Sequence, residues 1–322
     1  MPELDLLTLA VRLRPAGVVD LRPLAGGASS LTYAGRLGER RVVVKVAPPG
    51  VPPVHHRDVL RQARVLRALA GTAVPVPAVL YEDGGEPPAQ PPLFVMSLVE
   101  GDSFEPLYDL DAPRVPPETV AARLREAART MAGLHRLDPA SLGLAGEPVT
   151  GPPDEVERWS ETLRTVDPAL VPGWRDVRDA LLAATPEQVS AAVVHGDFRL
   201  GNLLAAGDRV TAVVDWEIWS VGDPRVDVGW FLINADPQTY RRPSRYAGWL
   251  PPPGELARVY EDTWGHPLTD VAWFEALACF KSAATWSLIV KHNRRRSSPD
   301  RGLEDMARVV PDLLARARDR VG

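Results

Sequence analysis

The chain has 322 residues, of which 45% are hydrophobic and 25% charged, an ordinary composition for a globular protein. This length favours a sizeable core divided between two domains or lobes. The net charge of -5 excludes general binding to polyanions, so we expect no nucleic-acid partner. The single cysteine, Cys279, excludes an intrachain disulfide framework and a cysteine-rich zinc site.

The first part of the chain predicts a helix and a β-hairpin. Residues 6–13 have the apolar spacing of a short amphipathic helix. Residues 24–46 contain two alternating or β-branched runs, and Gly38-Glu39 between them is a turn signal. Acids near the start and the lack of a long apolar run argue against a secretory signal, so we expect a cytoplasmic protein.

A segment of small residues precedes the first strand of this hairpin. Its backbone amides could contact the phosphates of a nucleotide, although most such segments are only loops. The residues concerned are Gly26, Gly27, Ser29 and Ser30. The pattern G-x-x-x-x-G-K-[ST] does not occur in the chain, which disfavours a P-loop enzyme.

One lysine lies inside the second strand of the hairpin. Alternation along residues 42–46 places Lys45 on the same face as Val43. A lysine in such a strand is costly unless its charge meets a partner. In kinases a strand lysine contacts the α- and β-phosphates of ATP. The alternative is an edge-strand lysine that faces water.

The next segments predict a helix, a strand and then a mostly helical half. Residues 57–70 carry a helical apolar stripe, and residues 93–99 have the composition of a strand. Residues 271–290 form the most apolar long stretch, but two charges interrupt it, which favours a buried helix over a membrane span. The helices expected in the second half are residues 120–137, 159–166, 176–184, 255–264, 269–292 and 302–318.

The pattern with the most chemical content lies in residues 193–228. One apolar run leads into His195-Gly196-Asp197, Asn202 follows five residues after the aspartate, and a second apolar run precedes Asp215. Phosphoryl transfer needs oxygen ligands for Mg²⁺ and a group near the acceptor hydroxyl. In kinases an aspartate near the hydroxyl, an asparagine and a metal-binding aspartate follow one another in this order along the chain. Taken singly, each residue could instead cap a helix or stabilise a turn.

The string HGDFRLGN at residues 195–202 resembles the catalytic-loop motif of the aminoglycoside phosphotransferase and choline kinase-like family. Asp215-Trp216-Glu217 resembles that family's metal-binding motif, and Gly222-Asp223-Pro224, with Asp227 beyond it, matches the usual continuation. The branch that the sequence most resembles is the acyl-CoA dehydrogenase family member 10-like phosphotransferases.

The resemblance implies an α+β, bilobal, protein-kinase-like fold. A small antiparallel sheet with a helix would form an N-terminal nucleotide-binding lobe over residues 1–98. Residues 99–322 would form a larger, mostly helical lobe for catalysis and acceptor binding, with a hinge at about 97–101. Backbone groups of Ser97, Leu98 and Val99 would then contact the adenine edge.

The resemblance also implies roles for individual residues. Asp197 would be the catalytic base, Asn202 and Asp215 would hold Mg²⁺, and Lys45 would contact ATP. A glutamate usual on the following helix is replaced by Gln62, which leaves open whether the amide suffices or Asp58 assists. Possible supporting residues are His195, Arg199, Glu217 and Asp223.

The acceptor is expected to be a small molecule with a hydroxyl group. Aminoglycosides are polycations, whereas the segment on the acceptor side carries Arg241, Arg242 and Arg245. Arginine side chains suit carboxylates and phosphates, so we expect a neutral or anionic acceptor, and a hydroxyacyl compound by resemblance. The alternative is that these arginines form solvated surface.

Several rival functions remain open at this point. An aminoglycoside or other antibiotic kinase is one alternative, and a nucleotide-binding scaffold without turnover is another, favoured only by Gln62. A protein kinase is disfavoured because no Ala-Pro-Glu sequence follows Asp215, and a serine hydrolase because no G-x-S-x-G pattern occurs. We expect a monomer or homodimer without a membrane partner.

Overall fold

The computed structural model describes residues 5–24, 30–108 and 114–322. Its contact pattern divides the chain into two compact units. The first unit contains Met1–Ser103 and Gly201–Trp219, and the second contains Phe104–Leu200 and Ser220–Gly322. The lobes predicted from the sequence, with their hinge at residues 97–101, stay a prediction, and the contact pattern groups 201–219 with the N-terminal segment.

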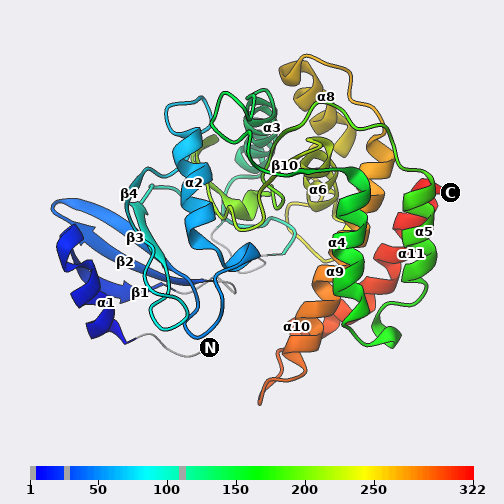
Figure 1. Ribbon diagram of the computed structural model, residues 1–322. Helices are drawn as coiled ribbons and strands as arrows, with labels where there is room; N and C mark the ends of the chain where they lie inside the picture. Colours follow the sequence, from blue (N-terminus) through cyan, green and yellow to red (C-terminus); the bar gives the residue numbers. More distant parts are fainter. Residues whose placement is uncertain (1–4, 25–29, 109–113) are drawn as a thin grey trace. The chain divides into compact units, whose positions relative to one another are not determined.

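The first unit is built on an antiparallel five-stranded sheet in the order β1-β2-β3-β5-β4 (Figure 1). The predicted hairpin is confirmed, with Gly38 at a φ of +58° in its turn. The predicted strand at 93–99 ends at Ser97, and two strands, β1 and β4, were not predicted. The strands are β1 (Val18–Pro23), β2 (Leu31–Leu37), β3 (Arg40–Val46), β4 (Val79–Asp83) and β5 (Leu93–Ser97).

Two helices and a second hairpin complete the first unit. Helix α1 (Leu6–Leu13) buries Leu9 and Leu13 in a core with alternate residues of β3, among them Val44. Helix α2 (Val59–Leu69) packs against β4 and β5. Since successive side chains of a strand point to opposite faces, the residues of β3 on either side of Val44 point away from α1. The hairpin consists of β8 (Leu203–Ala206) and β9 (Arg209–Val213).

The second unit is mostly helical, as predicted. A small sheet of β6 (Val149–Thr150), β10 (Ser220–Gly222) and β7 (Ala192–Val194) accompanies the helices. These are α3 (Pro117–His135), α4 (Pro152–Arg164), α5 (Trp174–Ala183), α6 (Arg225–Ala235), α7 (Pro237–Tyr240), α8 (Pro253–Trp264), α9 (Val271–Asn293), α10 (Arg301–Asp305) and α11 (Val309–Val321).

Several of these helices differ from the sequence predictions. Helix α4 begins at Pro152 and not at 159, because two prolines occupy its first turn, where the missing N–H groups cost nothing. Helices α6 and α7 were not predicted. The helix predicted over 302–318 is two helices, separated by a 3₁₀ turn at Met306–Arg308.

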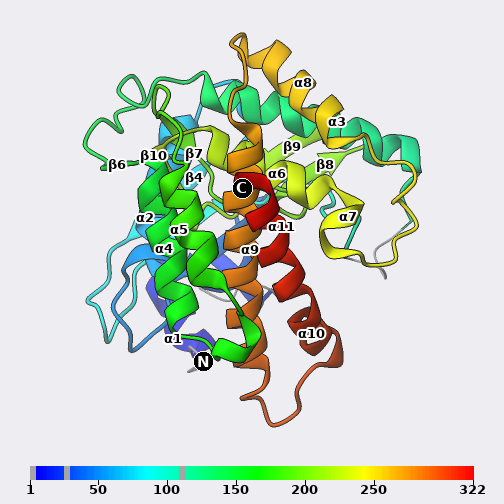
Figure 2. The same ribbon diagram turned by 90° about the vertical axis from the view of Figure 1, so that its right-hand side faces the viewer.

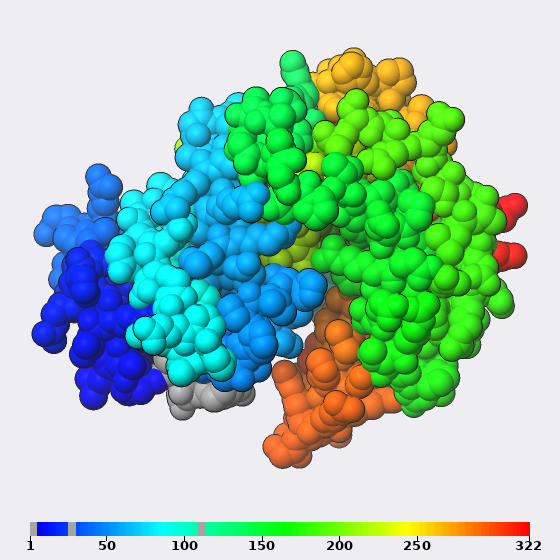
Figure 3. Space-filling model, viewed as in Figure 1, coloured from blue at the N-terminus to red at the C-terminus, as the bar shows by residue number. Residues whose placement is uncertain are grey.

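Helix α9 is the centre of the second unit. It is buried on several sides and packs against α4, α5, α6 and α11, which lie around it in Figure 2. Its buried residues include Cys279. Residues of α4 and α5 form a continuous part of this unit's surface (Figure 3). The expectation of a buried helix over 271–290 is confirmed, and no helix among the described residues is long and apolar enough to cross a membrane.

Helices α6 and α9 approach each other closely at Gly229. A Cβ atom at this position would lie 2.3 Å from the carbonyl oxygen of Phe274, a backbone atom that cannot move alone. Gly133 in α3 is also helical, but a Cβ there would meet no atom within 4 Å. The two glycines therefore differ in packing and not in secondary structure.

We predict that Gly229→Ala lowers the free energy of unfolding by about 1–3 kcal/mol, because the added methyl group overpacks the contact between the two helices. Gly133→Ala is the matched control and should raise it by about 0.5–1 kcal/mol through helix propensity. Chemical denaturation measures both. Equal effects from the two substitutions would contradict the close approach at Gly229.

Candidate active site

The loop after β7 is held through its backbone by a buried carboxylate. The N–H groups of His195 and Gly196 donate to the two oxygens of Asp227, at 2.7 and 2.8 Å. His195 Nδ1 accepts a hydrogen bond from the N–H of Asp197 at 3.1 Å. Asp227 and His195 are both 0% exposed. Asp227, which the motif continuation singled out, therefore holds this loop by hydrogen bonds.

A second histidine completes the surroundings of Asp227. His135 Nε2 lies 3.2 Å from Asp227 Oδ2, and His135 Nδ1 lies 2.8 Å from the Tyr260 hydroxyl. Burial alone would raise the pKa of Asp227, but its hydrogen bond with His135 and the attraction of both histidines hold the pKa of this carboxyl below its ordinary range. Asp227 is therefore a charged acceptor at neutral pH, and it fixes the loop.

The carboxylate of Asp197 is oriented by two donors within the second unit. Trp230 Nε1 donates to Asp197 Oδ1 at 2.7 Å, and Arg199 Nε lies 3.2 and 3.3 Å from the two oxygens. Arg199 Nη1 also donates to Glu105 Oε1 at 3.2 Å. Burial would lower the pKa of Arg199, but the carboxylates of Asp197 and Glu105 outweigh burial and raise it. Arg199 is thus a fixed cation beside Asp197.

In the first unit, Lys45 is buried and surrounded by oxygen atoms. Its Nζ lies 3.0 Å from Asp215 Oδ1, 3.1 Å from Gln62 Oε1 and 3.7 Å from Glu217 Oε1. Lys45 is 9% exposed and its strand, β3, is internal to the sheet. The alternative of an edge-strand lysine facing water is therefore wrong. Asp58 is not the missing acid, because its carboxylate caps α2 by accepting from a backbone N–H.

The second hairpin brings Asn202 and Asp215 to one end. Leu203 pairs with Val213, and the N–H of Val214 donates to the carbonyl of Asn202 at 2.9 Å. Asp215 has a φ of +67°, a left-handed conformation that side chains adopt at some cost and that recurs at functional sites. The backbone after β9 is thus turned at the position from which the carboxylate projects.

An amide oxygen and a carboxylate fit a Mg²⁺ ion, which prefers oxygen ligands. Among the described residues, no group of three or more His, Cys, Asp or Glu side chains is arranged to hold a metal. Mg²⁺ sites that use substrate phosphates need only one or two protein carboxylates. The residues Asn202 and Asp215 are therefore compatible with a metal shared with a nucleotide.

Other residues predicted for the site have mixed outcomes. Gly26, Gly27 and Ser29 lie outside the described residues, whereas Ser30 is described and buried. The N–H groups of Ser97 and Leu98 donate to carbonyl oxygens of Ala78 and Arg41. A contact of this segment with adenine, which also includes Val99, stays a prediction.

Asp223 holds the start of α6. Its carboxylate accepts three hydrogen bonds from Arg225, at 2.8 to 3.0 Å, and a longer one from the N–H of Val189. Arg225 is 1% exposed and begins α6. Asp223 therefore supports the helix that carries Trp230 and Asp227.

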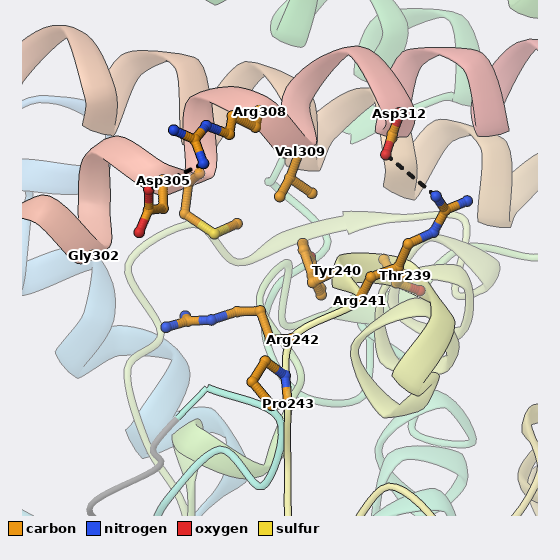
Figure 4. Close-up of a pocket in the computed structure, with 11 residues that line it drawn as sticks. Thr239, Tyr240, Arg241, Arg242, Pro243, Gly302, Asp305, Arg308, Val309 and Asp312 are labelled. Carbon is orange, nitrogen blue, oxygen red and sulfur yellow. Dashed lines mark ion pairs between the residues drawn. The ribbon is translucent and has the colours of Figure 1, made fainter.

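The arginines predicted on the acceptor side are divided between two environments. Arg241 and Arg242 line a cavity of about 450 Å³ between residues 239–243 and residues of the α10–α11 region (Figure 4). Arg242 also lies over the ring of Tyr108, 5.9 Å from its centroid, and Arg245, outside the cavity lining, lies over the ring of Tyr246 at 5.7 Å. Trp230 and Glu105 were missed by the sequence analysis, because neither belongs to a motif.

Comparison with known proteins identifies the class. A sequence model of the phosphotransferase enzyme family matches residues 20–261, most of the chain. The chain therefore belongs to the phosphotransferase enzyme family, as the motif at residues 195–202 predicted.

Acyl-CoA dehydrogenase family member 10 from Mus musculus is 30% identical over 223 residues, which cover 67% of this chain and 20% of the mouse protein. The chain thus spans only a fifth of that relative's length. This similarity agrees with the branch that the sequence was found to resemble.

Two solved structures confirm the kinase-like fold. A Ralstonia eutropha protein provisionally assigned as an aminoglycoside phosphotransferase has a TM-score of 0.79 at 24% identity, and the match covers 99% of this chain and 98% of the other. A thermostable mutant of aminoglycoside phosphotransferase APH(4)-Ia, in a ternary complex with AMP-PNP and hygromycin B, has a TM-score of 0.64 at 20% identity, with 98% and 97% covered. These likenesses concern the fold.

We predict that Asp227→Asn lowers the free energy of unfolding at pH 7 by about 3 kcal/mol, because buried donors then lose a charged partner. Since the pKa of Asp227 is lower in the folded than in the unfolded chain, its contribution is present above the unfolded-state pKa and is lost as the pH falls through the folded-state pKa. The difference between variant and wild type should therefore shrink below about pH 4. Denaturation at several pH values measures this.

Asp312→Asn provides the control for this prediction, because the Asp312 side chain is 59% exposed. Its effect should stay within about 0.5 kcal/mol at every pH. A pH-independent effect of Asp227→Asn would contradict the electrostatic role given to Asp227.

Proposed function

We propose that the protein transfers the γ-phosphoryl group of ATP to a hydroxyl of a small molecule. The observation that carries this proposal is the buried Lys45, whose Nζ lies 3.0 Å from Asp215 Oδ1. A strand lysine next to a metal-binding aspartate is the pair that phosphoryl transfer requires for holding phosphates. A buried ion pair is weak evidence of stability, so a role in binding is the better reason for it.

The residues divide the work as follows. Lys45 would contact the α- and β-phosphates, and Asn202 and Asp215 would hold Mg²⁺, which neutralises phosphate charge when bound. Asp197 would orient the acceptor hydroxyl and accept its proton. Arg199 keeps its charge beside Asp197 and would face developing negative charge. The bound AMP-PNP of the APH(4)-Ia complex supports ATP as the donor.

The presence of Gln62 in place of a glutamate is compatible with catalysis, because other groups around Lys45 supply negative charge. Its Oε1 accepts a hydrogen bond from Lys45, and the carboxylates of Asp215 and Glu217 supply the negative charge that an α2 glutamate would have supplied. The only sequence feature that favoured a scaffold without turnover is thereby weakened. Glu217 would therefore act on Lys45 more directly than it would act on the metal.

We predict that Asp197→Asn lowers kcat about a thousandfold, because the base is lost, while Mg²⁺-dependent ATP binding stays. Asp215→Asn should instead abolish the Mg²⁺-dependence of binding. Isothermal calorimetry with ATP, with and without Mg²⁺, and a coupled ADP-release assay measure these effects. Loss of ATP binding in Asp197→Asn, or full turnover by it, would remove Asp197 from the role of base.

We propose further that the acceptor is anionic or neutral and occupies the cavity lined by Arg241 and Arg242. Two carboxylates also line this cavity, and they face two arginines: Asp312 lies 3.6 Å from Arg241, and Asp305 lies 3.9 Å from Arg308 (Figure 4). Arg242 brings the cavity to a positive balance, since three arginines meet two aspartates. A guanidinium group is suited to a carboxylate or phosphate.

Hydrogen bonds connect this cavity to Asp197. Tyr240 lines the cavity, and its hydroxyl lies 3.4 Å from Asn234 Oδ1. Asn234 Nδ2 donates to the carbonyl of Trp230 at 2.8 Å, and the indole of Trp230 donates to Asp197. An acceptor in the cavity would therefore contact Tyr240, and it would have to extend beyond the lining residues for its hydroxyl to reach Asp197. The similarity to acyl-CoA dehydrogenase family member 10 makes hydroxyacyl compounds the first acceptors to test.

We predict that Arg242→Ala raises KM for hydroxy acids or their thioesters about tenfold and leaves KM for ATP unchanged, since one charged hydrogen bond is lost. Arg258→Ala, an exposed arginine of α8, removes the same charge elsewhere and should have no effect. Steady-state kinetics measures both. Efficient phosphorylation of kanamycin-type compounds or hygromycin B without activity on hydroxy acids would instead support the antibiotic-kinase alternative.

A further inference from the structure

A buried lysine lies beside the loop that carries Asp197. Lys281 is in the middle of α9 and is 4% exposed. Its Nζ donates a hydrogen bond to the carbonyl oxygen of Gly196, the residue before Asp197. A charge in such surroundings is costly unless it is well partnered. The mechanism described so far gives this residue no role.

The same ammonium group lies over an indole that contacts Asp197. Lys281 Nζ is 3.8 Å from the centroid of the Trp230 ring, and Trp230 Nε1 donates to Asp197 Oδ1 at 2.7 Å. Attraction between a cation and the face of an aromatic ring is strongest for tryptophan. Because a cation over the ring withdraws electron density, it makes the indole N–H a stronger donor, as in other polarised hydrogen-bond chains.

A second indole lies near the same cation. Trp159 of α4 lies 5.4 Å from Lys281 Nζ, measured to its ring centroid, and its Nε1 donates to the buried Glu155 at 3.1 Å. The ammonium group is thus placed by two aromatic rings and one carbonyl oxygen. Such a site fixes the position of the cation more narrowly than solvent would.

We propose that Lys281 and Trp230 are positioning residues for phosphoryl transfer. The cation of Lys281 fixes the Gly196 carbonyl and strengthens the indole hydrogen bond that holds the Asp197 carboxylate in one orientation. This inference rests on the proposed function of Asp197 as the base. Small misplacements of a catalytic group lower the rate by large factors, so holding the carboxylate in one orientation favours a high kcat.

The charge of Lys281 is not explained by stability. Burial lowers the pKa of Lys281 to about 8, although nearby carboxylates favour the ammonium form. Because the folded-state pKa lies below the unfolded one, the protonated lysine is held at a cost to folding. The charged groups that face it are Asp197 on the loop, Glu155 and Arg158 on α4, and Asp227 on α6.

The first test replaces Lys281 with a side chain of similar length and no charge. Lys281→Met should lower kcat between about tenfold and a hundredfold, leave KM for ATP unchanged and not lower Tm. Lys291→Met is the matched control, because Lys291 is on the same helix and also donates to a backbone carbonyl, that of Thr165. Its kinetics should match wild type. Unchanged kcat in Lys281→Met overturns the proposal.

A pH profile separates positioning from packing. In wild type, log kcat should fall above about pH 8, as Lys281 loses its proton. Lys281→Arg keeps a cation over this range, so its profile should lack that fall and its kcat at pH 7 should exceed that of Lys281→Met. Identical profiles for the wild type and Lys281→Arg overturn the electrostatic part of the proposal.

A spectroscopic measurement on the wild type tests the coupling without relying on a Lys281 variant. The nine tryptophans of ¹⁵N-labelled wild type give indole N–H signals, and Trp230→Phe assigns the one of interest. That proton should move upfield with a midpoint near pH 8, as the hydrogen bond to Asp197 weakens. A signal that does not titrate there overturns the coupling. If the wild type showed this titration but no phosphotransfer to any acceptor, the proposed function would be contradicted and the coupling between Lys281 and Trp230 would stand.

Discussion

The carboxylate of Asp227 is the contact on which the geometry of the loop at 195–197 depends. It is 0% exposed, accepts two consecutive backbone N–H groups and is supported by His135. Buried backbone donors without partners are costly, so the loop is stable in this form only while the charge of Asp227 is present. Asp197 follows directly, and its direction is therefore set by a residue that lies outside the proposed catalytic set.

Two buried lysines show how the protein places positive charge. Lys45 meets carboxylates, whereas Lys281 meets a carbonyl oxygen and the faces of two indoles. In the first case, under the proposed function, phosphates of the same sign would replace these partners. In the second the contacting groups are neutral, while the carboxylates of Asp197, Glu155 and Asp227 favour the charged form of the lysine. Both arrangements place charge where a purely stabilising core would avoid it.

Much of the fold could be predicted because its signals are local. The β2–β3 hairpin follows from a turn and alternating residues, and α9 follows from a long apolar run. Helix α6 was missed because it is buried on every side and so lacks amphipathic spacing. The start of α4 was missed because its first turn contains two prolines, which are not typical of a helix interior.

The site was predictable to the extent that its residues form a spaced motif. Asp197, Asn202 and Asp215 were found in this way, and Lys45 by its unusual strand. Trp230 and Lys281 are 33 and 84 positions beyond Asp197 in the numbering, so only tertiary packing brings them to the loop. Glu105, the partner of Arg199, is also distant in sequence and is brought to the loop by tertiary packing. Motifs thus predict the candidate catalytic groups, and packing determines how these side chains are held.

The single thiol of the protein has a practical consequence. Cys279 is fully buried in α9, and burial raises its pKa to about 12. Since only the thiolate reacts with maleimides and disulfides, the native chain offers them almost no target at neutral pH. Cysteines introduced at exposed positions, one in each unit, would therefore accept spectroscopic labels selectively in the otherwise unmodified sequence. The distance between two such labels would report directly on any change that a nucleotide or an acceptor causes.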